Sequence, residues 1–192
     1  MSLYEGSLRT VLDEIAGPSP APGAGAVSGV VTAMAAGLIA SAARRSTGWE
    51  EARAVSAQAQ ALRSRVEKLA EANAEAYLEA LALIEGAEED GSRDAAIGKA
   101  LDTAAQLPLS IAECAYDVAL LGAEAAEHGT PGGAEDAAAA ALLAEAAARA
   151  AAGLVAANLV SMPGDERVEQ AQRLAAAATD AARRAVAASA DR

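Results

Sequence analysis

The sequence predicts an all-α fold, a single-domain bundle of six or seven helices over residues 1–192. Alanine, the best helix former, supplies about three residues in ten. Residues that favour sheets are scarce, since Phe is absent and aromatic residues make up 2% of the chain. A length of 192 residues suits one domain with a core of its own.

The first predicted helix runs from Ser2 to Gly17. Ser2 and Glu5 form a capping-box pattern. An apolar stripe with helical spacing follows at Leu8, Val11, Leu12 and Ile15. Residues 18–25 hold three prolines and two glycines, which predicts a stiff, non-helical loop.

The next predicted helix contains a long uncharged stretch. Residues 26–43 are eighteen in number, which is the length of a membrane span. They are mainly Ala, Gly, Ser and Thr, which insert weakly into membranes. We therefore expect a helix buried all round at the centre of the bundle. Small residues at Gly29, Ala33 and Gly37 would let a neighbouring helix approach closely.

A long charged helix is predicted from about residue 49 to 84. Thr47 and Glu50 form its capping-box pattern, and Gly86 can end it. Its apolar seam contains one polar member, Asn73. A buried amide without a partner costs about 1–3 kcal/mol, so Asn73 is either a packing-register device or a site residue.

The C-terminal half is predicted to contain three or four further helices. A polar break at 88–92 precedes a helix at 93–106, and Pro108 marks a kink or the first turn of another helix that ends by Gly129. Residues 130–133 form a turn. A nearly continuous helix follows from Ala134 to Leu159, and Pro163 with Gly164 separates it from a last amphipathic helix.

The net charge and the small numbers of Cys and His residues exclude several classes of function. A net charge of −12 argues against nucleic acid and anionic membrane surfaces as partners. The single cysteine, Cys114, and the single histidine, His128, exclude an internal disulfide and Cys-based or paired-His metal sites. We expect no metal, a buried Cys114 and a cytoplasmic protein.

Three segments together resemble one family. They are residues 20–26 (PAPGAGA), residues 73–77 (NAEAY) and residues 129–136 (GTPGGAED), followed by an alanine-rich helix that carries Asn158. In this order they resemble the cyclodeaminase/cyclohydrolase family, which includes the C-terminal domain of formiminotransferase-cyclodeaminase and stand-alone methenyltetrahydrofolate cyclohydrolases. The resemblance spans essentially the whole chain and points to the stand-alone form.

The resemblance implies an all-helical homodimer that acts on one-carbon tetrahydrofolates. Relatives convert 5-formiminotetrahydrofolate to 5,10-methenyltetrahydrofolate with release of ammonia, or hydrolyse the methenyl compound. Deamination and hydrolysis use the same bound folate, so the sequence leaves both open. No cofactor beyond the tetrahydrofolate substrate is implied.

The same resemblance indicates the site residues. Asp136 matches the family's Asp in the second loop and is the main catalytic candidate. At a helix N-terminus its pKa would be lowered, which favours a base or a ligand-orienting carboxylate. The alternative is that Asp136 only caps its helix. Asn73 is the second catalytic candidate, and the expected substrate-binding residues are Pro22, Gly23, Ala24, Gly25 and Asn158.

Several positions depart from the family pattern. Asn73 stands where relatives usually carry Asp, and an amide cannot titrate. Leu154 and Ala156 replace an Asn and an Arg, and Glu50 and Glu51 replace lysines suited to an anionic folate tail. The alternative function is therefore a helical dimer of this family that binds another small molecule or none.

Overall fold

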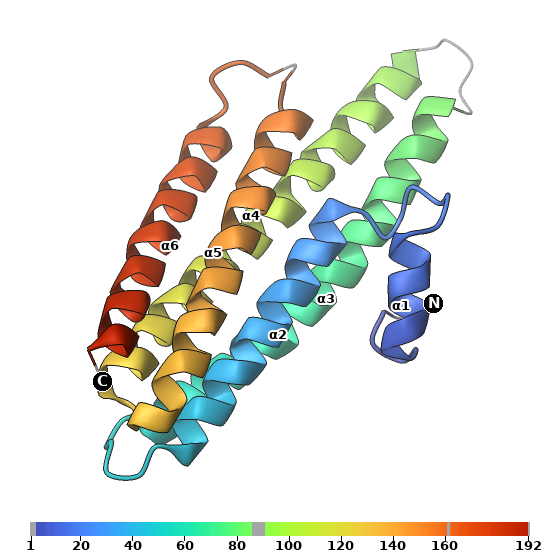
Figure 1. Cartoon of the computed structure of the whole chain (residues 1–192). Coiled ribbons are helices and arrows are strands. Elements are labelled where there is room, and N and C mark those ends of the chain that lie inside the picture. The colour runs from blue at the N-terminus through green and yellow to red at the C-terminus, as the bar shows by residue number, and fades with distance from the viewer. Residues whose placement is uncertain (1–2, 86–90, 161, 192) are drawn as a thin grey trace.

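The computed structural model describes residues 3–85, 91–160 and 162–191. These residues form six helices: α1 (Leu8–Ile15), α2 (Ala24–Arg45), α3 (Ala52–Glu85), α4 (Gly91–His128), α5 (Pro131–Asn158) and α6 (Glu166–Ala190). The five long helices α2 to α6 form a bundle, and the short α1 lies beside α2 and α3 on its outside (Figure 1). The predicted all-α bundle is confirmed.

Helix α2 is the uncharged helix of the sequence, and it packs against α3, α4 and α5. Its inner face is fully buried at Ala35, Ala36, Ile39 and Ala40. Both α2 and α5 are long and apolar enough to cross a membrane by length and composition, a test that core helices of soluble proteins also pass. In α2, 61% of the span is buried, but Met34 and Leu38 are exposed, so α2 is a core helix with one open face and is not buried all round as predicted.

Small side chains let the helices pack closely. A Cβ placed on Gly29 would lie 2.7 Å from Cβ of Ala70 on α3, so α2 and α3 touch through glycine here. A Cβ on Gly122 would lie 2.9 Å from Cβ of Ala141, which brings α4 and α5 equally close. Gly37, the third member of the predicted small-residue series, faces open space instead. Alanine thus fills a core that larger residues would force apart.

The two capping boxes predicted near the N-terminus do not begin helices. Helix α1 starts at Leu8, because Ser7 Oγ accepts a hydrogen bond from the backbone N–H of Thr10 at 3.1 Å. Ser2 lies outside the described residues. Helix α3 starts at Ala52, because a turn with Gly48 at φ +88° separates Thr47 from the helix. Gly has no Cβ and adopts this left-handed conformation freely.

Other predicted boundaries need smaller corrections. Pro108 lies inside α4, which continues through it to His128, so no separate helix begins there. Helix α5 begins at Pro131, the first-turn position that Pro favours. Helix α2 begins at Ala24, so Ala24 and Gly25 belong to its first turn and not to the loop. Gly86 and the centre of the predicted break lie outside the described residues.

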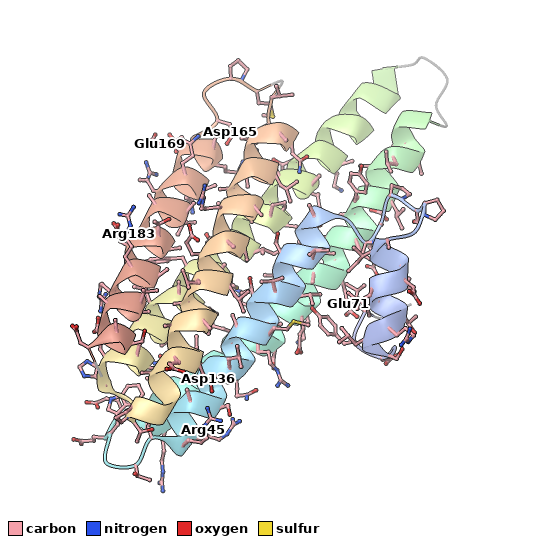
Figure 2. The ribbon with its side chains drawn as sticks, viewed as in Figure 1. Arg45, Glu71, Asp136, Asp165, Glu169 and Arg183 are labelled. Carbon is pink, nitrogen blue, oxygen red and sulfur yellow. The ribbon has the colours of Figure 1, made fainter. Side chains whose placement is uncertain are left out.

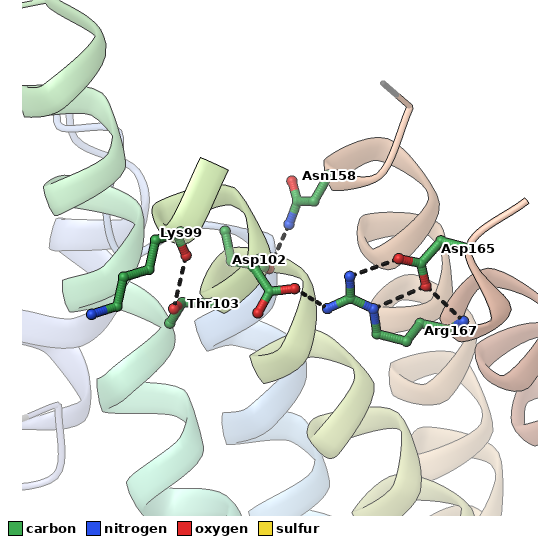
Figure 3. A network of polar contacts seen from close by, with 7 residues as sticks. Lys99, Asp102, Thr103, Asn158, Asp165 and Arg167 are labelled. Carbon is green, nitrogen blue, oxygen red and sulfur yellow. Dashed lines mark hydrogen bonds and ion pairs between the residues drawn. The ribbon is translucent and has the colours of Figure 1, made fainter. Parts of the chain in front are cut away.

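A polar cluster fixes the start of α6. The carboxylate of Asp165 caps the helix and accepts three hydrogen bonds from Arg167, one from its backbone and two from its guanidinium. Arg167 also donates to Asp102 of α4 at 2.7 Å (Figure 3). The side-chain hydrogen bonds from Arg167 lower the pKa of Asp165 to about 2. The cluster ties α6 to α4.

Candidate functional site

A cavity of about 320 Å³ lies where α2 begins and α5 ends. Four helices contribute to it: the first turn of α2, the middle of α3, the proline-containing part of α4 and the last turns of α5. Its lining residues are Pro20, Gly23, Ala24, Gly25, Asn73, Tyr77, Ala104, Pro108, Leu154 and Asn158. Both amides singled out in the sequence therefore share one cavity with Gly23, Ala24 and Gly25, three of the expected substrate-binding residues.

Asn73 is held against the backbone of α2. A Cβ on Gly25 would lie 2.7 Å from Cγ of Asn73, so only glycine leaves room for this amide. Asn73 is half-buried, and its side chain has no hydrogen-bond partner among the described residues. A half-buried amide with unused donors and acceptor is suited to bind a polar ligand.

Asn158 is the last residue of α5 and reaches across to α4. Its Nδ2 donates a hydrogen bond to the carbonyl oxygen of Ala104 at 2.6 Å (Figure 3). Leu154, four residues earlier on the same helix face, adds an apolar wall. The C-terminal turn of α5 thus supplies one polar and one apolar side chain to the cavity.

The N-terminus of α2 adds backbone donors. Gly23 is the N-cap residue and makes no side-chain capping hydrogen bond. The first N–H groups of a helix have no partner within the helix and carry a partial positive charge. Since Gly23, Ala24 and Gly25 line the cavity, this helix end can bind an anionic or carbonyl group there.

Asp136 lies elsewhere. It is in the second turn of α5 and forms an ion pair with Arg45, with 2.5 Å between Oδ2 and Nη2. The pair sits where α2 ends and α5 begins (Figure 2). The residues that line the cavity lie at the other end of both helices. A 22-residue helix is about 33 Å long, so Asp136 does not reach the cavity of its own chain. It is not the N-cap of α5 either, because Thr130 occupies that position.

Pro22 is not among the residues that line this cavity; it lines a second cavity of about 390 Å³. That cavity is lined by three carboxylates, from Glu14, Glu71 and Glu75. Glu71 accepts a hydrogen bond from the backbone N–H of Leu3. The described residues contain no group of three or more His, Cys, Asp and Glu arranged to hold a metal ion.

Comparison with known families decides the relationship. The formiminotransferase-cyclodeaminase family model matches residues 7–179. The chain belongs to this family. The crystal structure of formiminotetrahydrofolate cyclodeaminase from Thermotoga maritima is similar, with a TM-score of 0.84, 25% identity and 95% of each chain covered. Comparison with curated proteins gives no match.

The formiminotransferase-cyclodeaminase resemblance inferred from three sequence segments is therefore confirmed, and so is the family fold. The segments separate in space. Two of them, the first loop and the Asn73 segment, meet at the cavity together with Asn158, whereas the Asp136 segment lies at the opposite end. The roles of these residues in the family chemistry stay predictions.

Sequence reasoning gave no role to four cavity residues: Pro20, Tyr77, Ala104 and Pro108. A signal existed for Tyr77, which is four residues after Asn73 and so lies on the same helix face. No sequence signal connects Ala104 or Pro108 with Asn158, because only the packing of α4 against α5 brings them together.

The lining residues determine what the cavity can do chemically. They provide two amides, the Tyr77 hydroxyl and backbone N–H groups, and they include no carboxylate, ammonium, guanidinium or imidazole. Neither amide can take up or release a proton at ordinary pH. This arrangement is suited to bind a polar ring system and to stabilise negative charge, but the described lining residues supply no strong acid or base.

Proposed function

We propose that this protein binds a reduced one-carbon folate in the cavity between α2, α3, α4 and α5 and acts on it as a cyclodeaminase or a cyclohydrolase. The observation that carries the proposal is that Asn73 and Asn158 converge beside the N-terminus of α2, each with unused hydrogen-bonding capacity. The fold is that of a formiminotetrahydrofolate cyclodeaminase, which supports the same substrate class.

The cavity volume suits a ring system and not a whole folate. Ligand cavities commonly measure about 300–1,000 Å³, and this one is at the lower limit. The pterin ring would occupy it with its amide and amino edges on Asn73 and Asn158, and the remainder of the folate would extend outward. No cofactor beyond the folate substrate is proposed.

The reaction requires positioning and two proton transfers. In cyclodeamination N10 of the folate forms a bond to the formimino carbon and the bond from that carbon to the leaving nitrogen breaks. When the formimino group starts in its protonated form (=NH2+), N10 gives up one proton and the leaving nitrogen gains one, so ammonia departs and the methenyl product carries the positive charge. Holding the folate so that N10 faces the formimino carbon is the contribution that amides and backbone N–H groups can make.

Asp136 remains the catalytic candidate for the proton transfers. Because it lies far from the cavity of its own chain, this role requires a second protomer. Asp136 can serve a cavity only if that cavity belongs to a second protomer. Glu50 and Glu51 precede α3 at the same distant end, so they do not face the cavity of their own chain. We therefore propose a homodimer in which this end approaches the partner's cavity. We also propose a cytoplasmic location.

Mixing variants tests this role for Asp136. Asp136→Asn and Asn158→Ala should each be inactive alone, and their mixture should regain part of the activity because one of the two cavities in a mixed dimer is intact. If Asp136→Asn keeps full turnover, Asp136 is only the partner of Arg45. Arg149→Gln, which removes an exposed charge of the same helix, is the control and should be fully active.

The decisive measurement is to supply the purified protein separately with 5-formiminotetrahydrofolate and 5,10-methenyltetrahydrofolate and to follow the methenyl absorbance. Appearance of methenyl from the first identifies a cyclodeaminase, and loss from the second faster than without protein identifies a cyclohydrolase. If neither rate exceeds the control without protein, the proposed activity is wrong.

A second candidate function is binding without turnover. The specific observation favouring it is that no described residue lining the cavity carries a carboxylate, and Asn73 stands where the family resemblance implies Asp. In that case calorimetry should detect binding of 5-formyltetrahydrofolate although both turnover assays stay at the control rate. No binding and no turnover would leave a helical dimer that binds another small molecule or none.

A further inference from the structure

Pro108 leaves one backbone carbonyl of α4 without its helical hydrogen-bond donor. It is fully buried, and the helix runs on through it. Proline has no backbone N–H, so it cannot donate the helical hydrogen bond to the carbonyl four residues earlier, which is that of Ala104. In general, a proline ring inside a helix also crowds the carbonyl four residues earlier. The oxygen of Ala104 is thus left to be satisfied from outside the helix.

Asn158 supplies the missing donor from another helix. Its Nδ2 lies 2.6 Å from the Ala104 oxygen. Ala104 is buried, and a buried carbonyl oxygen needs a hydrogen-bond donor. The amide of Asn158 is that donor. The residues concerned, Ala104, Pro108 and Asn158, all line the candidate cavity.

The bond fixes which way the Asn158 amide faces. A carbonyl oxygen can only accept, so Nδ2 must point to Ala104 and Oδ1 must point away from it. Within the part of the chain that the structure describes, this Oδ1 has no hydrogen-bond partner. Asn73 differs, because no hydrogen bond to a described residue fixes the orientation of its amide.

We propose that Pro108 is a positioning residue that, through the Ala104 carbonyl, locks Asn158 so that its Oδ1 is a fixed acceptor for an N–H group of the ligand. The cavity then selects a ring that presents an amino or amide N–H at this point and rejects one that presents an oxygen. The proposal deepens the proposed function, on which its ligand part rests. Its structural part stands on the contacts between α4 and α5 alone.

A double-mutant cycle tests the structural part without any ligand. Asn158→Ala should lower the urea midpoint when residue 108 is Pro, because Ala104 loses its donor. In the Pro108→Ala background the helix supplies its own N–H, and the loss caused by Asn158→Ala should fall to half or less. Asn73→Ala is the matched control and should have the same effect in both backgrounds. Additive effects of Asn158→Ala and Pro108→Ala would overturn the proposal.

Two ligands test the acceptor. Pterin carries an amino group at ring position 2, and lumazine carries an oxygen there. The wild-type protein should bind pterin at least tenfold more tightly, and Asn158→Ala should remove this preference. Pro108→Ala should reduce the preference without abolishing pterin binding, because Asn158 is still present but no longer locked. Equal affinity of the wild type for both rings would overturn the acceptor role.

The two experiments separate the two proposals. If neither ring binds, the proposed folate function fails, and the stability cycle still decides whether Pro108 positions Asn158. If pterin binds but the cycle is additive, the folate site stands and the positioning role is wrong.

Discussion

At the scale of single residues, Gly25 and Asn73 form the closest contact of the cavity. Gly25 has helical backbone and no positive φ, so its requirement for glycine is steric and not conformational. The side chain that would be displaced by a larger residue is the Asn73 amide. Substitution at residue 25 therefore tests the site with little direct effect on helix formation.

Gly25→Ala should displace Asn73 and weaken binding of 5-formyltetrahydrofolate by about tenfold, or ~1.4 kcal/mol. Overpacking should also cost about 1–3 kcal/mol of stability. The control is Gly37→Ala in the same helix, where a Cβ meets open space. It should leave binding unchanged and raise the free energy of unfolding by about 0.5–1 kcal/mol. Unchanged affinity in Gly25→Ala would remove Asn73 from the site.

Asn73→Asp restores the carboxylate that relatives usually carry. It places an ionisable group beside the positive end of α2, and we expect turnover of 5-formiminotetrahydrofolate to rise by about tenfold or more, which is the lower range for acid–base catalysis. The pH dependence of the rate should then differ from that of the wild type, because residue 73 has become ionisable. A rate equal to that of the wild type at every pH contradicts the prediction that residue 73 is catalytic.

At the scale of elements, the apolar and alanine-rich helices were predictable and their starts were not. The long uncharged pattern of α2 and the alanine-rich pattern of α5 favour extensive burial against other helices, which few arrangements satisfy. A capping box needs only two residues three apart, so the same pattern also occurs outside helices. Ser7, and not Ser2, is the N-cap residue of α1. The left-handed turn at Gly48 separates Thr47 from the start of α3.

The start of α6 gives a pH prediction. The pKa of Asp165 is lowered to about 2 in the folded protein, against about 3.9 in an unfolded chain. A lowered folded pKa stabilises the fold above about pH 4, and this stabilisation is lost as the pH falls to about 2. The urea midpoint should fall over that range, and less steeply in Asp165→Asn. Asp180→Asn, an exposed position on the same helix, should follow the wild type.

At the scale of the whole molecule, apolar side chains remain exposed around α1 and α2. Leu8 is 61% exposed and Met34 is 50% exposed, and both line an apolar cavity of about 370 Å³ between these helices. Leu12 and Leu38, one turn further along each helix, are exposed as well. Such a surface indicates a protein contact, and the proposed homodimer would cover it.

A paired substitution tests this interface. The wild type should be a dimer by light scattering at micromolar concentration, and Leu8→Glu with Met34→Glu should make it a monomer, because burying two carboxylates in an apolar contact is costly. Val160→Glu alters an exposed apolar residue after α5 and should leave the dimer intact. A monomeric wild type would contradict the homodimer, and with it the role of Asp136 in a partner's cavity.

The sequence by itself determined the helical class, the burial of α2 and the family, because composition, periodicity and ordered motifs are properties of the chain alone. It also singled out Asn73 as a polar residue on an apolar seam, and Asn158 through the family resemblance. Only the tertiary structure decided that these two amides meet Gly25 in one cavity and that Asp136 does not. Because the helices are about 30 Å long, motifs that resemble one family can lie at opposite ends of the bundle. Which helix ends meet is decided by the packing of the helices.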